Sequence, residues 1–212
     1  MEIKKGFGKD RYLEREFQKL IKKFNVKNII ETGTFEGDTT EMFSKMVENV
    51  YTIESKKEFF LDAKLKLSKL QNIKGFLGNS PKVIEKILPS IKGRTLFFLD
   101  AHWGYPWPIL GELEKISEHP RFKESIIIIH DFYVPNKNFG FDSYYQSNSS
   151  LILFLKRVFG LLGKIIGKKI IKKQKLDYPF IEITLKKINP DYKHYYNSQA
   201  EGDKRGVIFI HP

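Results

Sequence analysis

Side chains that can bind ligands or move protons follow five apolar runs in the first 131 residues. These groups are Glu31 to Gly37, Glu54, Gly78 to Ser80, Asp100 to Trp103, and His130 with Asp131. Carboxylates accept hydrogen bonds and bind cations, and an imidazole exchanges a proton near neutral pH. Five such groups predict one functional site if the fold gathers the ends of the apolar runs.

The first of these groups lies in IIETGTFEGDTTEMF, residues 29–43. Gly33 and Gly37 permit a close approach of the backbone to a ligand, and the helix start that follows offers unpaired N–H groups. A dinucleotide-binding turn needs G-x-G-x-x-G, and Phe35 stands in the place of its second glycine. The spacing therefore argues against a pyrophosphate at this turn.

Strand-like and helix-like segments alternate up to residue 131. Apolar runs predict strands at 27–32, 49–54, 72–78, 94–100 and 125–131. Helical spacing predicts helices at 12–24, 38–47, 57–70, 80–89 and 109–119. In the fourth of these helices, Ser80 is the expected N-cap and Pro81 the first helical residue.

After Asp131 the pattern changes, and residues 132–150 are expected to form a loop. A basic apolar segment follows, then a predicted helix at 178–188. Two further strands, 191–198 and 205–212, would form a hairpin at the edge of the sheet.

This order predicts an α/β fold with a doubly wound, mostly parallel, seven-stranded Rossmann-like sheet and a C-terminal antiparallel hairpin. A chain of 212 residues suffices for one sizeable core, so we expect residues 1–212 to form a single domain. In such sheets, ligands bind beyond the carboxyl ends of the strands. The five polar groups should therefore meet at one edge.

The ordered motifs resemble class I S-adenosylmethionine-dependent methyltransferases. The resemblance covers residues 26–135 and the C-terminal hairpin, and rests on E-x-G-x-x-x-G, an acid ending the second strand, G-N-S and L-D-A-H-W. With the helix I-L-x-E-L-E and the pair H-D after the fifth strand, it is most similar to small-molecule and sugar O-methyltransferases. It implies methyl transfer to a hydroxyl of a small molecule, sugar or glycan.

The resemblance also implies a binding site for S-adenosylmethionine. The glycine turn would pass under the methionine part, Glu31 would anchor the amino group, Glu54 would bind the ribose hydroxyls, and the G-N-S residues would flank the adenine. The expected cofactor-binding residues are Glu31, Gly33, Thr34, Gly37, Glu54, Asn79, Ser80 and Asp100. The family more often has Asp at position 79. The competing interpretations are a helix cap for Glu31 and a solvated surface acid for Glu54.

Two arrangements could take the proton from an acceptor hydroxyl, and the sequence leaves both open. In the first, Asp100 and Asp131 bind Mg²⁺, and His102 or His130 accepts the proton. This resembles metal-dependent catechol and macrolide-sugar methyltransferases, which usually supply a third oxygen ligand where this chain has Phe132. In the second, no metal is bound and His102 acts as general base, oriented by Asp131. Structural roles compete for both histidines: packing for His102 and a backbone contact for His130.

Aromatic residues near these groups are candidate walls of an acceptor pocket, because their faces suit sugar rings and planar substrates. They are Trp103, Tyr105, Trp107, Tyr133 and Tyr144. Each could equally anchor a surface loop.

The formal net charge of +12 is unevenly distributed, since residues 151–175 contain eight Lys or Arg and no acid. We predict a basic amphipathic insertion at 148–175. It could dock on an anionic membrane, form a lid or subunit interface, or contact RNA. RNA is the least favoured partner, because no stacking motif accompanies the charges.

The sequence has no cysteine, no apolar run of eighteen residues and no signal-peptide pattern. We therefore expect a cytoplasmic protein, with attachment to the inner membrane surface through 151–175 as a second possibility. The oligomeric state stays open. Two other functions compete with O-methylation: RNA methylation, and a non-catalytic methyltransferase-like module for membrane attachment or interaction.

Overall fold

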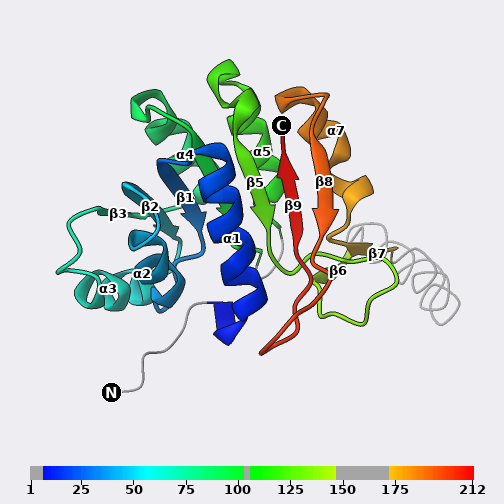
Figure 1. The fold of residues 1–212 in the computed structure, drawn as a ribbon, viewed down its shortest axis with the longest axis horizontal. Coiled ribbons are helices and arrows are strands. Elements are labelled where there is room, and N and C mark those ends of the chain that lie inside the picture. Colours follow the sequence, from blue (N-terminus) through cyan, green and yellow to red (C-terminus); the bar gives the residue numbers. More distant parts are fainter. Residues whose placement is uncertain (1–6, 103–105, 147–171) are drawn as a thin grey trace, which may run out of the picture.

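The structure is a computed structural model that describes residues 7–102, 106–146 and 172–212. Its centre is a seven-stranded sheet in the order β3-β2-β1-β4-β5-β9-β8 (Figure 1). The strands are β1 (Asn28–Thr32), β2 (Asn49–Glu54), β3 (Ile73–Leu77), β4 (Thr95–Leu99), β5 (Ile126–Ile129), β8 (Lys193–Tyr196) and β9 (Ile208–His211). The first five are parallel, and β9 runs antiparallel between β5 and β8. The predicted fold class and C-terminal hairpin are confirmed.

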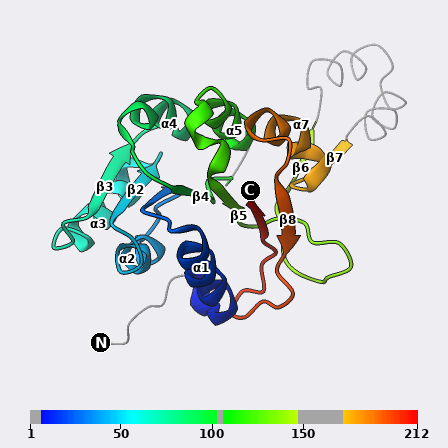
Figure 2. The ribbon, with the colours of Figure 1, turned by 45° about the horizontal axis from the view of Figure 1, so that its top comes forward.

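Helices cover both faces of the sheet (Figure 2). They are α1 (Arg11–Phe24), α2 (Asp38–Ser44), α3 (Lys57–Lys66), α4 (Ser80–Ile87), α5 (Ile109–Ser117) and α7 (Tyr178–Ile188). Three short 3₁₀ segments lie at Phe7–Lys9, Leu88–Ser90 and Pro120–Glu124. Apolar side chains of α4, α5 and α7 share one core with the sheet, and those of α1 and α2 share the other.

The buried strands explain why the sheet could be read from apolar runs. Every residue of β4 and β5 is buried, which includes all four isoleucines of β5. Helix α1 shows the complementary pattern, because Leu13, Phe17 and Leu20 recur at helical spacing and are buried. Asp10 caps its start by accepting the Leu13 N–H, so the helix begins where a side chain satisfies its free donors.

Three expectations need correction. The segment predicted to be loop contains β6 (Ser143–Gln146), and the end of the predicted insertion contains β7 (Lys172–Lys175). These two polar strands pair antiparallel in a separate two-stranded ribbon, which lacks the apolar alternation that marks a strand in the sequence. Ser80 is not the N-cap of α4: Asn79 occupies that position, and the Ser80 hydroxyl bonds elsewhere.

Most of the predicted insertion, including the amphipathic helix expected up to residue 168, lies outside the described residues. Within the part of the chain that the structure does describe, no helix combines the length and apolar character needed to cross a bilayer.

Candidate active site

Backbone hydrogen bonds join the carboxyl ends of five neighbouring strands. The bonds are Gly78 N–H to Glu54 O (2.8 Å), Gly33 N–H to Ile53 O (2.9 Å), Asp100 N–H to Thr32 O (3.1 Å) and His130 N–H to Leu99 O (3.2 Å). The strand order also reverses here, because β2 and β4 lie on opposite sides of β1. Ligands in doubly wound sheets bind at such a point. The predicted groups therefore do gather at one edge.

Glu31 is fully buried in β1 and has one carboxyl oxygen without a partner. Its Oε2 accepts hydrogen bonds from the hydroxyls of Thr40 and Thr52, whereas Oε1 accepts none from the residues that the structure describes. Burial raises the pKa of Glu31 to about 8, against the lowering effect of the two threonines. Within the described residues, the hydrogen bonds of Glu31 go to threonine hydroxyls and not to backbone N–H groups of α2, so the cap interpretation of Glu31 is not supported.

The glycine turn requires glycine for a specific reason. Gly33 has φ 90°, and a Cβ at this position would lie 2.8 Å from the carbonyl oxygen of Asp100. Gly37 has φ 76°, and its Cβ would lie 3.0 Å from Leu67 Cδ1. The Thr34 hydroxyl between them pairs with Thr52 at 2.6 Å. The turn thus packs directly on the end of β4.

Glu54 is tied to the backbone of the same turn. Its carboxylate accepts the N–H groups of Phe35 (2.9 Å), Ser55 (2.8 Å) and Lys56 (2.9 Å), and the residue is 6% exposed. The interpretation as a solvated surface acid is therefore wrong. A carboxylate has about four acceptor sites, so room remains for at least one ligand hydroxyl.

The residues expected near the adenine differ in their availability. Asn79 is exposed and makes no side-chain cap bond to α4. Ser80 is buried, and its hydroxyl donates to Glu112 Oε1 on α5. The other oxygen of Glu112 makes no hydrogen bond of normal geometry within the described part of the chain. Burial raises the pKa of this carboxyl to about 7, against the lowering effect of the Ser80 and Thr32 hydroxyls. Glu112 was not expected from the sequence. The feature that could have revealed it is its place as an acid on the apolar face of the predicted helix.

His102 is held in one tautomer. Its Nε2 lies 2.9 Å from the backbone carbonyl oxygen of His130, and a carbonyl can only accept, so Nε2 carries the hydrogen. The ring is 1% exposed, and Nδ1 has no hydrogen-bond partner among the described residues. The neutral ring therefore presents an unused lone pair at Nδ1.

His130 lies between two carboxylates. Its Nδ1 is 3.2 Å from Asp100 Oδ1 and 3.1 Å from Asp131 Oδ1. Burial alone would lower the pKa of His130, but the two carboxylates outweigh it and raise the pKa to about 10. The expected pairing of Asp131 with His102 is not among the contacts of the described residues, because Asp131 faces His130 and Arg205 instead.

Arg205, just before β9, completes this cluster and was not expected from the sequence. Its Nε donates to Asp131 Oδ1, and its NH2 donates to Asp142 Oδ1 at 2.8 Å. Burial would raise the pKa of Asp131, but His130 and Arg205 hold it well below its usual range. The topology could have indicated it: because the last strand runs antiparallel beside β5, the residues just before that strand lie near the end of β5.

The two predicted metal ligands, Asp100 and Asp131, approach each other and His130. Ligand atoms of Asp100, His130 and Asp131 lie within 4.8 Å of one another. Mg²⁺ prefers an octahedral set of oxygen ligands, whereas one of these three donors is an imidazole nitrogen. Oδ1 of Asp131 also already accepts from Arg205 and faces His130. As arranged, the donor set does not fit Mg²⁺.

Two of the candidate aromatic walls pack on other elements. Trp107 makes an edge contact with Phe180 of α7, with ring centroids 5.7 Å apart. The Tyr133 ring lies under the Lys175 ammonium at 4.0 Å. Trp103 and Tyr105 lie outside the described residues.

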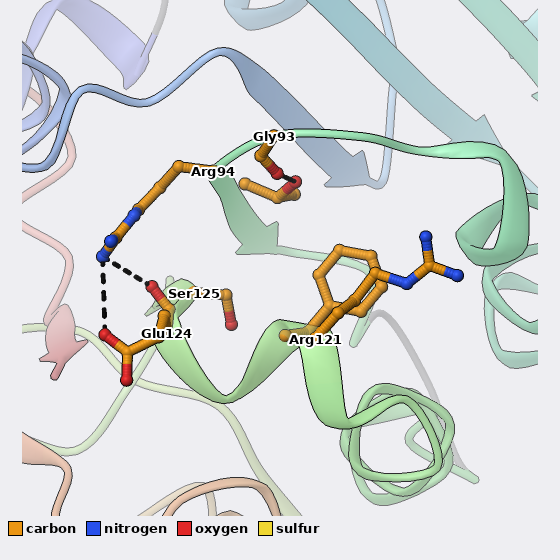
Figure 3. A pocket seen from close by; sticks show the side chains of 7 residues that line it. Gly93, Arg94, Arg121, Glu124 and Ser125 are labelled. Atoms are coloured by element: carbon orange, nitrogen blue, oxygen red, sulfur yellow. Dashed lines mark hydrogen bonds and ion pairs between the residues drawn. The ribbon is translucent and has the colours of Figure 1, made fainter.

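A pocket of about 290 Å³ lies at the opposite edge of the sheet, beside the starts of β4 and β5 (Figure 3). It is lined by Gly93, Arg94, Thr95, Arg121, Phe122, Glu124 and Ser125. Arg94 bonds the Glu124 carbonyl at 3.2 Å, and Arg121 bonds the Ile91 carbonyl at 3.3 Å. Its cations are thus already paired, and none of the predicted site residues lines it.

The sheet order and the antiparallel strand beside β5 define the Rossmann-like fold of class I S-adenosylmethionine-dependent methyltransferases. A structure from Staphylococcus aureus, provisionally described as a caffeoyl-CoA O-methyltransferase, is 19% identical, with 96% of this chain and 84% of that chain covered and a TM-score of 0.54. The O-methyltransferase TomG of Streptomyces achromogenes, solved in complex with S-adenosylmethionine, is 12% identical, with 94% and 78% covered and a TM-score of 0.58.

A third neighbour is described as a precorrin 8W decarboxylase of Methanobacterium thermoautotrophicum, at 13% identity, 93% and 89% coverage and a TM-score of 0.52. No family model matches the chain, and no curated protein matches it by sequence. Identities this low establish the fold, and the third neighbour shows that the fold carries more than one chemistry. The function must be argued from the site.

Proposed function

We propose that the chain is an S-adenosylmethionine-dependent O-methyltransferase that acts on a hydroxyl of a small molecule or of a sugar unit. The observation that carries the proposal is the free, buried Nδ1 of His102 at the strand-end edge that also holds the glycine turn. A neutral imidazole with one nitrogen already fixed is suited to remove a proton from a weak oxygen nucleophile.

The residues around the glycine turn fit S-adenosylmethionine. Glu31 Oε1 is an orphaned, buried carboxyl oxygen, which an ammonium group such as the amino group of that cofactor would satisfy. Glu54 keeps acceptor capacity for a ribose hydroxyl, and the exposed Asn79 is available to an adenine. We assign Gly33, Thr34, Gly37, Ser80 and Asp100 to the walls of this site.

The cofactor would supply a methyl group activated by a positively charged sulfur. His102 would accept the proton of the acceptor hydroxyl at Nδ1 while its Nε2–H stays on the His130 carbonyl. The resulting imidazolium would be stabilised by Asp142, whose carboxylate is close enough for the two charges to interact. His130 and Asp131 then hold the carbonyl that orients His102, and do not take the proton themselves.

A Mg²⁺ ion at Asp100 and Asp131 is the competing interpretation, favoured by the closeness of the two carboxylates to His130. The guanidinium of Arg205 and the imidazole donor weigh against it, so we route no step through a metal.

The experiment that tests the proposal is calorimetry with S-adenosylmethionine and its demethylated product, followed by methyl transfer to a panel of phenols and free or lipid-linked glycans. Binding in the micromolar range with turnover on a hydroxyl acceptor would support it. Absence of binding would overturn it in favour of the non-catalytic module, and transfer to RNA alone would favour the RNA methyltransferase.

Attachment to an anionic membrane through residues 151–175 stays a prediction, since most of this segment lies outside the described residues. Sedimentation with vesicles that contain anionic lipid would test it. Equal binding by the full chain and by a chain lacking 148–171 would contradict it. That deletion keeps β7, which pairs with β6.

A further inference from the structure

We infer that Arg205 occupies the position of a divalent cation at this site, so that methyl transfer here proceeds without a bound metal. The statement about methyl transfer rests on the proposed function. The structural claim is that a guanidinium, and not a metal ion, binds the carboxylate cluster. Asp100, Asp131 and Asp142 gather at one end of β4 and β5, and Arg205 is the arginine that binds two of them.

The first support is the geometry of the guanidinium. Its Nε donates to Asp131 and its NH2 to Asp142 at 2.8 Å, so one cation bridges two carboxylates. A planar guanidinium has five donors in a fixed fork, and charge-assisted bonds of this kind are among the strongest in proteins. A metal ion that bound Asp131 Oδ1 would have to displace this group.

The second support is that the backbone around Arg205 is fixed on two sides. Gly140 N–H donates to Lys204 O at 2.9 Å, and Gly206 N–H donates to Gly140 O at 2.8 Å. Asn197 Nδ2 holds the Arg205 carbonyl at 3.0 Å. A Cβ at position 140 would lie 2.8 Å from Arg205 Nη1. The guanidinium therefore fits here only because residue 140 is a glycine.

The third support is the buried state of the group that Arg205 holds. Asp131 is 4% exposed and has a left-handed backbone with φ 55°, and its carboxylate accepts from Arg205 in the segment before β9. A carboxylate this deeply buried needs a countercharge. Arg205 and His130 provide it from this chain.

Arg205 is therefore a positioning residue, which acts on the acceptor through Asp131, His130 and the carbonyl that fixes His102. Its guanidinium would also keep a divalent cation away from the carboxylates. Loss of Arg205 should therefore change metal binding as well as the stability of the fold. Removing the guanidinium leaves Asp131 and Asp142 without the cation that bridges them, while His130 still faces Asp100 and Asp131. With one positive charge fewer, the three carboxylates should then bind a divalent ion.

The test uses the full-length protein after treatment with a chelator, titrated with Mn²⁺ and followed by the electron paramagnetic resonance signal of free Mn²⁺. Wild type should bind no stoichiometric Mn²⁺ in the micromolar range. Arg205→Met should bind one ion per chain, at least about tenfold more tightly than wild type, and Arg205→Met with Asp131→Asn should lose it again. Arg205→Lys, which keeps a positive charge, should stay close to wild type.

Arg94→Met is the matched control. It removes the same charge from an arginine that also faces a carboxylate, Glu124 at 3.7 Å, at the opposite edge of the sheet. One Mn²⁺ bound by wild type and lost in Asp131→Asn would overturn the inference, as would equal Mn²⁺ binding by the Arg205→Met and Arg94→Met proteins. If Arg205→Met does not fold, the wild-type and Arg205→Lys titrations still decide. None of these readouts requires S-adenosylmethionine, so failure of the inference and failure of the proposed function are separable.

Discussion

The Nε2–H of His102 is donated to the backbone carbonyl of His130 at 2.9 Å, and this bond leaves Nδ1 as the nitrogen free to accept a proton. The two residues come from the ends of neighbouring strands, β4 and β5. The sheet therefore sets both the tautomer and the direction of the His102 ring, and no hydrogen bond of the described residues joins a carboxylate to it.

Replacing His102 should slow turnover strongly while leaving cofactor binding intact. We expect His102→Gln to lower kcat by roughly 100- to 10,000-fold, the range typical of a lost general base. The Kd for S-adenosylmethionine should change little, because the glycine turn and Glu54 are untouched. His119→Gln, after the end of α5, is the control. Full activity in His102→Gln would show that another group takes the proton.

The glycine turn can be tested with two glycines of almost equal φ. Gly33 and Gly93 have φ 90° and 89°, so alanine at either position costs about 1–2 kcal/mol for the left-handed backbone. At Gly33 the new methyl group also overlaps the Asp100 carbonyl at 2.8 Å, whereas the nearest atom at Gly93 is 3.5 Å away. Overpacking should add roughly 1–3 kcal/mol.

Urea unfolding of the two variants measures the difference. Gly33→Ala should unfold at lower urea than Gly93→Ala and should lose S-adenosylmethionine binding, which Gly93→Ala should keep. Equal midpoints would mean that the turn does not pack on the end of β4.

Glu54 should stabilise the turn before any ligand arrives. Glu54→Gln replaces one acceptor oxygen by a donor that would face a backbone N–H, which should cost about 1–3 kcal/mol. The affinity for S-adenosylmethionine should also fall. Glu58→Gln, an exposed acid in the first turn of α3, should change neither quantity. An unchanged free energy of unfolding in Glu54→Gln would argue against the three backbone contacts.

Stability of the ligand-free protein should depend on the protonation of Glu31. The folded-state pKa is about 8 and the ordinary value is 4.5, so the folded state holds the proton more tightly. This contribution to stability is fully present below pH 4.5 and is lost as the pH rises through about 8. Glu31→Gln resembles the protonated acid and should not show this loss.

The measurement is the difference in Tm between wild type and Glu31→Gln across this range. The two proteins should be similar at low pH, and the variant should become the more stable one above pH 8. A difference in Tm that does not vary with pH would contradict a buried, neutral Glu31.

Much of the fold could be predicted because its central strands, β1, β4 and β5, are buried on both faces. The run of four isoleucines in β5 and the apolar run of β4 indicate buried strands. The predicted bounds of β2 and α7 agree with the structure. The ribbon of β6 and β7 could not be found this way. Its strands S-Y-Y-Q and K-K-Q-K carry no apolar alternation, so only their pairing identifies them.

The site was predictable as a set of residues, but its contacts were not. Parallel strands guarantee that Glu31, Asp100 and His130 approach one edge, yet the direction of each side chain depends on backbone details such as the positive φ of Asp131. That conformation turns Asp131 toward Arg205 and away from His102. Arg205 itself lies 74 residues further along the chain, where no local pattern connects it to β5.

The position of β9 between β5 and β8 also affects the tendency of the incompletely folded chain to aggregate. Without β9, the isoleucine strand β5 would present an open, wholly apolar edge, which is the kind of surface that recruits other chains into intermolecular sheets. The segment that delivers Arg205 to the acidic cluster is the same one that closes this edge. Substitutions that weaken β9 should therefore lower the yield of monodisperse protein as well as its catalytic competence.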